Sequence, residues 1–316
     1  MKIVSTAQLR EELREDLSQS FPEVSFEYYK SMKDAEHALD QAEVLITYGE
    51  DLTETEINKS TQLKWIMVIS AGLEKMPLKL IKEKDIIVTN ARGIHRVPMA
   101  EYTFTMLLHV AKNAKMWLEN QSKAIWDRRI KMEELHDQTL ALIGPGAIGS
   151  EIARLAKAFG MTTIGVNTKG TPVDYIDVIY KIDDLLQAVQ NAKYVVSILP
   201  ETADTYKILD SKFFEAMRND AVFVNIGRGK TVDQSSMLIA LQNNQIQHAV
   251  LDVFEEEPLP NDHPFWKMDN VTVSPHFSSV TEGYQPRALE IFKKNLSNYI
   301  KGSNDWINLI DLDRGY

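Results

Sequence analysis

The first ninety residues alternate between short β-branched runs and longer segments whose apolar residues recur at helical spacing. The runs predict strands at 2–5, 24–28, 44–48, 65–70 and 86–89. The segments between them predict helices at 8–20, 32–41, 53–60 and 73–84. Strands that alternate with helices favour a parallel sheet covered on both faces, so this region predicts a flavodoxin-like α/β domain.

A second series of strands begins at Thr139. Its strands are predicted at 139–143, 162–166, 194–199, 221–226, 248–253 and 271–274, with a weaker candidate at 178–182. Before this series, the Val97-Pro98 pair predicts the first turn of a helix that continues to about Trp117, because proline is tolerated in a first turn. Residues 118–137 show no clear period and predict an arm or a loop.

The C-terminal residues predict one further helix. Leu289, Phe292, Leu296 and Tyr299 recur at spacings of three and four, and Gly302 ends the stripe. Too little chain remains to form another domain, so this helix is expected to pack on a domain already made. The predicted fold class is therefore α/β, with two doubly wound parallel-sheet domains.

A glycine-rich turn joins the strand at 139–143 to the following helix. Its sequence is Gly144-Pro145-Gly146-Ala147-Ile148-Gly149. Gly144 permits the tight turn, Gly146 lets the backbone approach a pyrophosphate, and Gly149 allows close packing of the helix, whose free N–H groups favour an anion. The motif alone also fits a plain glycine turn. The next strand ends where a ribose-contacting residue is expected, which favours dinucleotide binding in a Rossmann domain.

Asn167 stands at that ribose-contacting position, where Asp or Glu is common. A carboxylate there would bind the ribose hydroxyls of NAD and repel a 2′-phosphate, whereas Asn is neutral. Thr168 and Lys169 follow, and the Lys169 ammonium is suited to pair with that phosphate. The pattern favours NADP over NAD. Two alternatives stay open: Lys169 as a solvated loop cation, and an Asn167 that accepts either cofactor.

Composition narrows the partners and the chemistry. The sequence has 35 Lys and Arg against 45 Asp and Glu, a net charge of −10, so we expect no nucleic acid or membrane partner. The absence of cysteine excludes disulfides, thiolate metal sites and cysteine nucleophiles, and we expect no metal. No apolar run approaches the ~20 residues that span a bilayer, and the N-terminus lacks a secretory pattern, so we expect a cytoplasmic protein.

Three later strands are followed by polar residues suited to one reaction. Arg228 follows the strand at 221–226, Glu257 follows 248–253, and His276 follows 271–274. Ligands bind beyond the carboxyl ends of parallel strands, so these side chains are expected to converge. Arg binds carboxylates, His transfers protons, and a Glu beside the His favours its imidazolium form, as reduction of a 2-oxo acid requires. Each residue also has a plainer explanation: Arg228 as a surface cation, Glu257 as part of a solvated acidic loop, and His276 as the cap of a strand. These separate explanations account less well for the three residues as a set.

Five short blocks spread over most of the chain form an ordered set. They are Asn90-Ala91-Arg92-Gly93-Ile94-His95 with Ala100-Glu101, Thr139-Leu140-Ala141-Leu142-Ile143-Gly144, Asn225-Ile226-Gly227-Arg228-Gly229, Leu251-Asp252-Val253-Phe254 with Glu257-Pro258-Leu259, and Ser274-Pro275-His276. Together they resemble the D-isomer-specific 2-hydroxy acid dehydrogenases, which include glyoxylate/hydroxypyruvate reductases and phosphoglycerate dehydrogenases. The resemblance implies a discontinuous substrate-binding domain of residues 1–97 and 282–316 and a dinucleotide-binding domain of residues 98–281. It also implies a small-molecule 2-oxo or 2-hydroxy acid as substrate, and a homodimer with 118–137 as a candidate arm.

The resemblance assigns roles to individual residues. Arg228 would hold the substrate carboxylate and carbonyl, His276 would be the acid/base, and Glu257 would orient and charge it. The substrate-binding set it implies is Ser70, Ala71, Gly72, Arg228 and His276, the first three through their backbone. The cofactor-binding set comprises Gly144, Gly146, Ala147, Ile148, Gly149, Asn167, Thr168, Lys169, Leu199, Pro200, Thr205, Ile226, Gly227, Arg228, Asp252 and His276. Within it, Asp252 would contact the nicotinamide amide, and the segment from Leu199 to Thr205 would flank the adenosine half.

The chain departs from the family pattern at three places. Pro145 stands where the family often has Leu, Asn167 replaces the common Asp, and Phe277-Ser278-Ser279 follows the His where smaller residues are usual. Two other functions stay open: a formate- or phosphite-type dehydrogenase of the same fold, and a dinucleotide-sensing corepressor. The Arg, Glu and His set favours the hydroxy acid dehydrogenase. The sequence does not specify which 2-oxo acid is the substrate.

Overall fold

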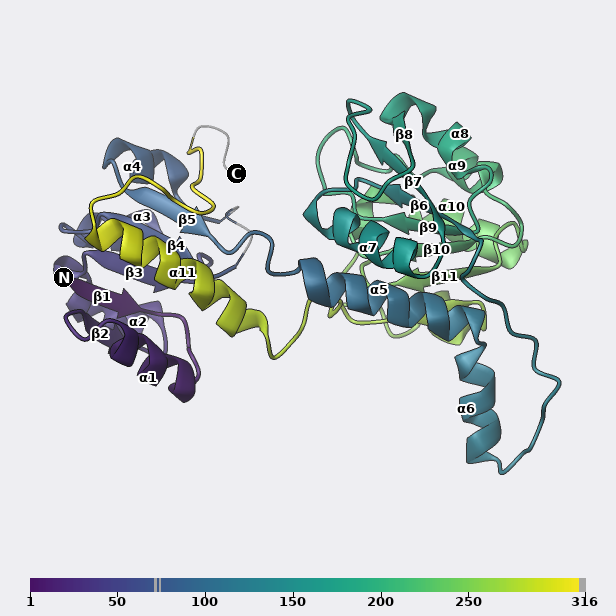
Figure 1. Cartoon of the computed structure of the whole chain (residues 1–316), viewed down its shortest axis with the longest axis horizontal. Coiled ribbons are helices and arrows are strands. Elements are labelled where there is room, and N and C mark those ends of the chain that lie inside the picture. The colour runs from purple at the N-terminus through teal and green to yellow at the C-terminus, as the bar shows by residue number, and fades with distance from the viewer. Residues whose placement is uncertain (71–72, 74, 313–316) are drawn as a thin grey trace. The chain divides into compact units, whose positions relative to one another are not determined.

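The computed structural model describes residues 1–312 except 71, 72 and 74. The chain divides into two compact units, one of Met1–Ile94 with Thr281–Tyr316 and the other of His95–Val280. Figure 1 labels their helices and strands. Each unit is a parallel sheet covered by helices, which confirms the predicted α/β class with two doubly wound domains.

The first unit contains a five-stranded sheet. Its strands are β1 (Lys2–Ser5), β2 (Ser25–Tyr28), β3 (Val44–Thr47), β4 (Trp65–Val68) and β5 (Ile87–Asn90). They lie in the order β2-β1-β3-β4-β5, and each neighbouring pair is parallel, which is the flavodoxin-like arrangement. The helices of this unit are α1 (Glu11–Ser20), α2 (Met32–Ala35), α3 (Glu54–Lys59), α4 (Leu78–Glu83) and α11 (Tyr284–Ile300), with a 3₁₀ helix at Glu36–Gln41.

Alternate strand residues build two cores on the faces of this sheet. Val44, Ile46 and Trp65 pack on one face with residues of α1 and α11. Leu45 and Ile66, their neighbours in sequence, pack on the other face with residues of α2, α3 and α4. The predicted apolar stripe of the C-terminal helix supplies Leu289, Phe292 and Leu296 to the first of these cores, so the end of the chain is part of the first unit.

The second unit contains a seven-stranded sheet. Its strands are β6 (Thr139–Ile143), β7 (Thr162–Asn167), β8 (Val178–Lys181), β9 (Tyr194–Ser197), β10 (Val222–Asn225), β11 (His248–Leu251) and β12 (Val271–Val273). The order is β12-β11-β10-β9-β6-β7-β8 with every pair parallel, the doubly wound order of dinucleotide-binding domains. Its helices are α5 (Arg96–Ala111), α6 (Ala114–Ser122), α7 (Ala147–Ala158), α8 (Leu185–Val189), α9 (Ser211–Ala216) and α10 (Gln234–Gln242), with 3₁₀ helices at Ile182–Asp184, Gly229–Thr231 and Pro264–Lys267.

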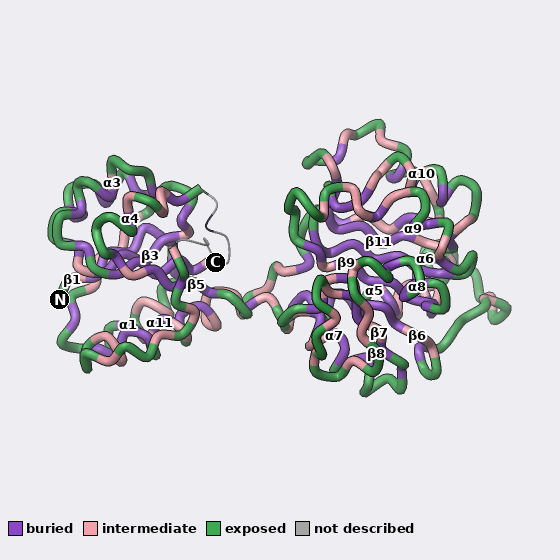
Figure 2. Tube along the Cα trace, turned by 90° about the horizontal axis from the view of Figure 1, so that it is seen from above, coloured by how far each residue is buried: buried purple, intermediate pink, exposed green. Residues whose placement is uncertain are grey.

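The helices of the second unit cover both faces of its sheet. Leu140 and Val196 belong to a core shared with α5 and α7, while Ala141 and Val195 belong to a core shared with α8, α9 and α10. Figure 2 shows the strands of each unit as buried segments surrounded by exposed ones. The carboxyl ends of seven parallel strands therefore lie together and leave their loops free to form a site.

The long helix predicted from Val97 to about Trp117 is wrong as a single element. Helix α5 ends at Ala111, and Asn113 has a φ of 51°, in the left-handed region that an α-helix excludes. Helix α6 begins at Ala114, so the first residues of the predicted arm at 118–137 are helical. Figure 1 shows α6 and the segment that follows it projecting from the rest of this unit.

Other boundaries moved by a few residues. The helix predicted at 73–84 is α4, which begins only at Leu78, after a proline. The helix predicted at 32–41 is one α-helical turn continued as a 3₁₀ helix. Within the described part of the chain, none of the helices has both the length and the apolar character needed to cross a bilayer.

Candidate active site

The glycine turn after β6 leads directly into α7. Gly144 has a φ of 80°, and Gly146 is the residue that caps the helix. No side chain of the described residues caps this helix, and a Cβ placed on Gly146 would meet no atom within 4 Å. The space beside Gly146, at the residue before Ala147 and Ile148, is therefore open. This arrangement fits the pyrophosphate of a dinucleotide, which the helix dipole also favours.

Leu199 brings three strand ends together. A Cβ placed on Gly144 would lie 3.1 Å from Leu199 Cδ2, and one placed on Gly227 would lie 2.6 Å from the Leu199 carbonyl oxygen. The predicted cofactor residues after β6, β9 and β10 therefore adjoin one another. The next loop is fixed by the Thr205 hydroxyl, which donates to the Pro200 carbonyl oxygen at 2.6 Å.

Asn167 organises the loop that follows β7. Its Oδ1 accepts hydrogen bonds from the backbone N–H of Lys169 (3.2 Å) and Thr171 (3.1 Å), and its Nδ2 donates to the Thr171 carbonyl oxygen at 2.8 Å. Thr168 and Lys169 are exposed at the tip of this loop. Lys181, on β8, pairs with Asn167 in the sheet register. The loop therefore has lysines at its tip and on its flank, and a neutral side chain at its base.

Arg228 lies in a tightly built loop after β10. The Asn225 side chain accepts from the Gly227 N–H at 3.1 Å and donates to the Arg228 carbonyl oxygen at 3.3 Å. A Cβ placed on Gly229 would lie 1.8 Å from the Phe254 carbonyl oxygen, so only glycine fits there. The exposed Arg228 guanidinium donates to the Gly227 carbonyl oxygen at 2.9 Å, which leaves further N–H groups for a carboxylate.

His276 and Glu257 are in direct contact. His276 Nδ1 lies 2.7 Å from Glu257 Oε2, and the side chains are 45% and 36% exposed. Glu257 Oε1 accepts the Phe254 N–H at 3.0 Å, which fixes the carboxylate. Their loops follow β12 and β11, and the loop of Arg228 follows β10, the next strand in the sheet. The sheet order therefore places the three predicted catalytic groups in adjacent loops.

Asp252 is fully buried, at 0% exposure, behind the loop of His276. Its carboxylate accepts hydrogen bonds from the Ser274 hydroxyl (2.6 Å) and from the backbone N–H groups of Phe277 (3.0 Å) and Ser278 (2.9 Å). The family resemblance implies a contact between this residue and the nicotinamide amide, which stays a prediction. In the structure its side chain binds the loop.

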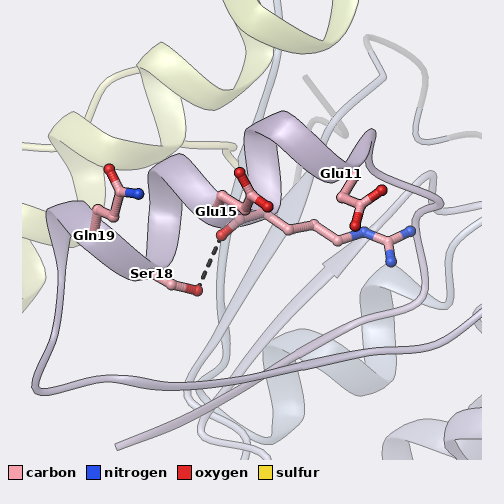
Figure 3. Close-up of a pocket in the computed structure, with 5 residues that line it drawn as sticks. Glu11, Glu15, Ser18 and Gln19 are labelled. Atoms are coloured by element: carbon pink, nitrogen blue, oxygen red, sulfur yellow. Dashed lines mark hydrogen bonds between the residues drawn. The ribbon is translucent and has the colours of Figure 1, made fainter.

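A cavity of about 450 Å³ opens beside the His276–Glu257 pair. Its remaining walls are mostly apolar: Phe254, Pro258, Leu259, Asn261, Trp266, Val273 and Pro275. A different hollow, on α1 in the first unit, is polar and is lined by Glu11, Arg14, Glu15, Ser18 and Gln19 (Figure 3). It contains none of the predicted site residues, and Ser18 there donates to the Arg14 carbonyl oxygen at 3.0 Å.

The sequence did not specify the role of His95, which precedes α5. Burial, and then the positive charge of Arg228, lower the pKa of His95. His95 therefore stays neutral at neutral pH and adds no second cation beside Arg228.

In the first unit, the hydroxyl of the predicted substrate residue Ser70 donates to the Tyr48 carbonyl oxygen at 3.0 Å. Ala71 and Gly72 lie outside the described residues.

Comparisons with known proteins agree on one family. The family model described as D-isomer specific 2-hydroxyacid dehydrogenase, NAD binding domain, matches residues 104–278 of the chain. The chain is 33% identical to a D-3-phosphoglycerate dehydrogenase of Methanocaldococcus jannaschii over 83% of this chain and 50% of that one, so it spans half of that relative's length. It is 27% identical to glyoxylate/hydroxypyruvate reductase B of Klebsiella pneumoniae over 84% of both chains.

A solved structure extends the likeness to both units. A D-isomer specific 2-hydroxyacid dehydrogenase family protein of Aeromonas salmonicida has 29% identity and a TM-score of 0.86, with 99% of each chain covered. The ordered blocks, the two parallel sheets and the matched residues 104–278 therefore lead to one conclusion: the chain belongs to the D-isomer specific 2-hydroxyacid dehydrogenase family of NAD(P)-dependent oxidoreductases.

Proposed function

We propose that the protein reduces a small 2-oxo acid to the D-2-hydroxy acid with NADPH. The observation that supports this function most strongly is the 2.7 Å contact between His276 and Glu257, beside the loop of Arg228 at the carboxyl end of the dinucleotide-binding sheet. A His–Glu acid/base pair next to a guanidinium suits the conversion of a carbonyl to an alcohol in a substrate that carries a carboxylate.

In the proposed reaction, Arg228 and His276 have different roles. Arg228 binds the substrate carboxylate and carbonyl oxygen through its free N–H groups and offsets the negative charge that grows on that oxygen. The Nδ1 atom of His276 is hydrogen-bonded to Glu257, so Nε2 is the atom that donates a proton to the forming alkoxide. The dinucleotide, when bound at the glycine turn, supplies the hydride that completes the alcohol. In the reverse direction His276 Nε2 accepts the proton.

The preference for NADPH over NADH rests on the loop after β7. Asn167 brings no negative charge to the ribose-contacting position, because its side chain is a neutral amide, and hydrogen bonds hold that amide within its own loop. Lys169 at the tip of the loop, with Lys181 in register on β8, supplies positive charge for a 2′-phosphate. We expect Lys169→Ala to raise the dissociation constant of NADPH and to leave that of NADH unchanged. An equal effect on both cofactors would argue against the preference.

A rate assay tests the reaction itself. The oxidation of NADPH and NADH is followed by absorbance with glyoxylate, hydroxypyruvate and branched 2-oxo acids. The relatives named glyoxylate/hydroxypyruvate reductase B make the first two the substrates to try first. His276→Ala should remove turnover and retain cofactor binding. Oxidation of formate or phosphite, or nucleotide-dependent binding of a protein without turnover, would replace this proposal by one of the two alternatives.

We also propose that the protein forms a homodimer through α6 and the segment after it. The apolar side chains exposed there support this assembly: Met116, Trp117, Leu118, Ile125, Trp126 and Met132. Trp126 is 91% exposed, and such a group of apolar side chains is typical of a protein interface. Sedimentation should give twice the mass of the chain, and Trp126→Ser should weaken the dimer. A monomer at all concentrations would contradict the proposal.

A further inference from the structure

The backbone of His276 is in a strained conformation. Its φ is 52°, in the left-handed region that residues other than glycine rarely adopt. Such a conformation persists only where the surroundings hold it, and it is common at functional sites. The His276 N–H donates to the Asp252 carbonyl oxygen at 2.9 Å, so part of the restraint comes from the end of β11.

A chain of buried hydrogen bonds holds the residues on both sides of His276. Ser274, two residues before it, donates its hydroxyl hydrogen to Asp252 at 2.6 Å, so its oxygen is the acceptor for the Tyr102 hydroxyl at 2.5 Å. Burial raises the pKa of Tyr102 to about 12, so the phenol keeps the proton it donates. The Tyr102 ring also packs edge-on against Phe277, the residue after His276, with ring centroids 6.0 Å apart.

We propose that Tyr102, on α5, is a positioning residue that holds His276 against Glu257 through Ser274, Asp252 and Phe277. Tyr102 does not touch the reacting atoms. Its hydroxyl and its ring instead fix the two ends of a short strained segment. Without the hydroxyl, the segment is free to relax toward an ordinary backbone conformation, and His276 Nδ1 moves away from the carboxylate that keeps the ring in place. The inference rests on the proposed role of His276 as the acid/base.

The hydroxyl of Tyr102 can be removed without removing its ring. Tyr102→Phe should lower kcat by about tenfold, the effect of one lost buried hydrogen bond, while KM and the cofactor dissociation constant stay within twofold. Tyr194→Phe is the matched control, because Tyr194 is buried in the same core and its hydroxyl has no hydrogen-bond partner among the described residues. This control should keep the parental kcat.

Ser274 provides a second test that leaves Tyr102 intact. Ser274→Ala removes the link and should lower kcat as Tyr102→Phe does, whereas Ser274→Thr keeps a hydroxyl and should retain most of the activity. This comparison decides the matter if Tyr102→Phe fails to fold, as judged by urea unfolding. A parental kcat in folded Tyr102→Phe, or equal losses in the two Ser274 variants, would overturn the inference. Absence of turnover in the parent protein with every 2-oxo acid would instead overturn the proposed function.

Discussion

Replacement of Glu257 by glutamine would test the proposed acid/base pair with the smallest change in shape. The carboxylate accepts two hydrogen bonds, one from His276 Nδ1 at 2.7 Å and one from the Phe254 N–H at 3.0 Å. An amide offers one oxygen and one NH₂ group. If its oxygen stays with Phe254, its NH₂ group faces Nδ1, and a protonated imidazole then meets a donor instead of an anion.

The size of the loss follows from the exposure of the pair. Hydrogen bonds to charged groups contribute about 1.5–3 kcal/mol, and water screens this pair because the side chains are 45% and 36% exposed. We therefore expect a loss of about 2 kcal/mol in transition-state stabilisation, which corresponds to roughly a 30-fold fall in kcat. The dissociation constant of the cofactor should stay unchanged, since the change alters neither the glycine turn nor the loop of Asn167.

The assay is steady-state oxidation of NADPH with the best 2-oxo acid, combined with a fluorescence titration of cofactor binding. Glu256→Gln is the matched control, because Glu256 is an exposed neighbour with no hydrogen bond or ion pair to the described residues. A kcat for Glu257→Gln within threefold of the parent would refute the role of the pair. Equal losses in the two variants would refute it too, since they would indicate a general effect of charge.

Three further changes test other parts of the structure. Burial lowers the pKa of His248 from 6.5 to about 4, so protonation of His248 opposes folding. In urea titrations the free energy of unfolding should therefore fall by up to about 3 kcal/mol as the pH is lowered from 6.5 to 4. The fall should be smaller in His248→Gln. Gly229→Ala places a Cβ 1.8 Å from the Phe254 carbonyl oxygen and should destabilise the protein by about 1–3 kcal/mol in the same titrations; an unchanged midpoint would contradict the overlap. Gly146→Ala adds a methyl group in open space, so its midpoint should change little while the dissociation constant of NADPH rises at least tenfold.

The fold could be predicted because its signals are local. Buried parallel strands are continuous β-branched runs, and each of these runs became a strand to within a few residues. The break between α5 and α6 could not be predicted, because Lys112 and Asn113 interrupt the helical period only through the left-handed backbone of Asn113. The late start of α4 had a visible signal in Pro77, which restricts the residue before it.

The arrangement of the candidate site could be predicted at the level of residue types and strand ends. Arg228, Glu257 and His276 each follow a strand, and parallel pairing of adjacent strands brings their loops together. What fixes their side chains was not predictable, because the partners are backbone groups or residues distant in sequence. Tyr102 is 172 residues from Ser274, and its position within α5 gives no sign of that contact.

The sheet order also explains why the loop of His276 needs such a contact. β12 is an edge strand of three residues, paired only with β11, so fewer ladder hydrogen bonds hold it than hold β10 or β11. His276, the proposed acid/base, follows this short edge strand and loses its position if the strand frays. The buried carboxylate of Asp252 and the hydroxyl of Tyr102 supply side-chain hydrogen bonds at the end of β12, where a neighbouring strand would otherwise supply backbone ones. The short edge strand β12 thus receives buried side-chain hydrogen bonds at its end, close to the point where the proposed role of His276 requires a fixed backbone.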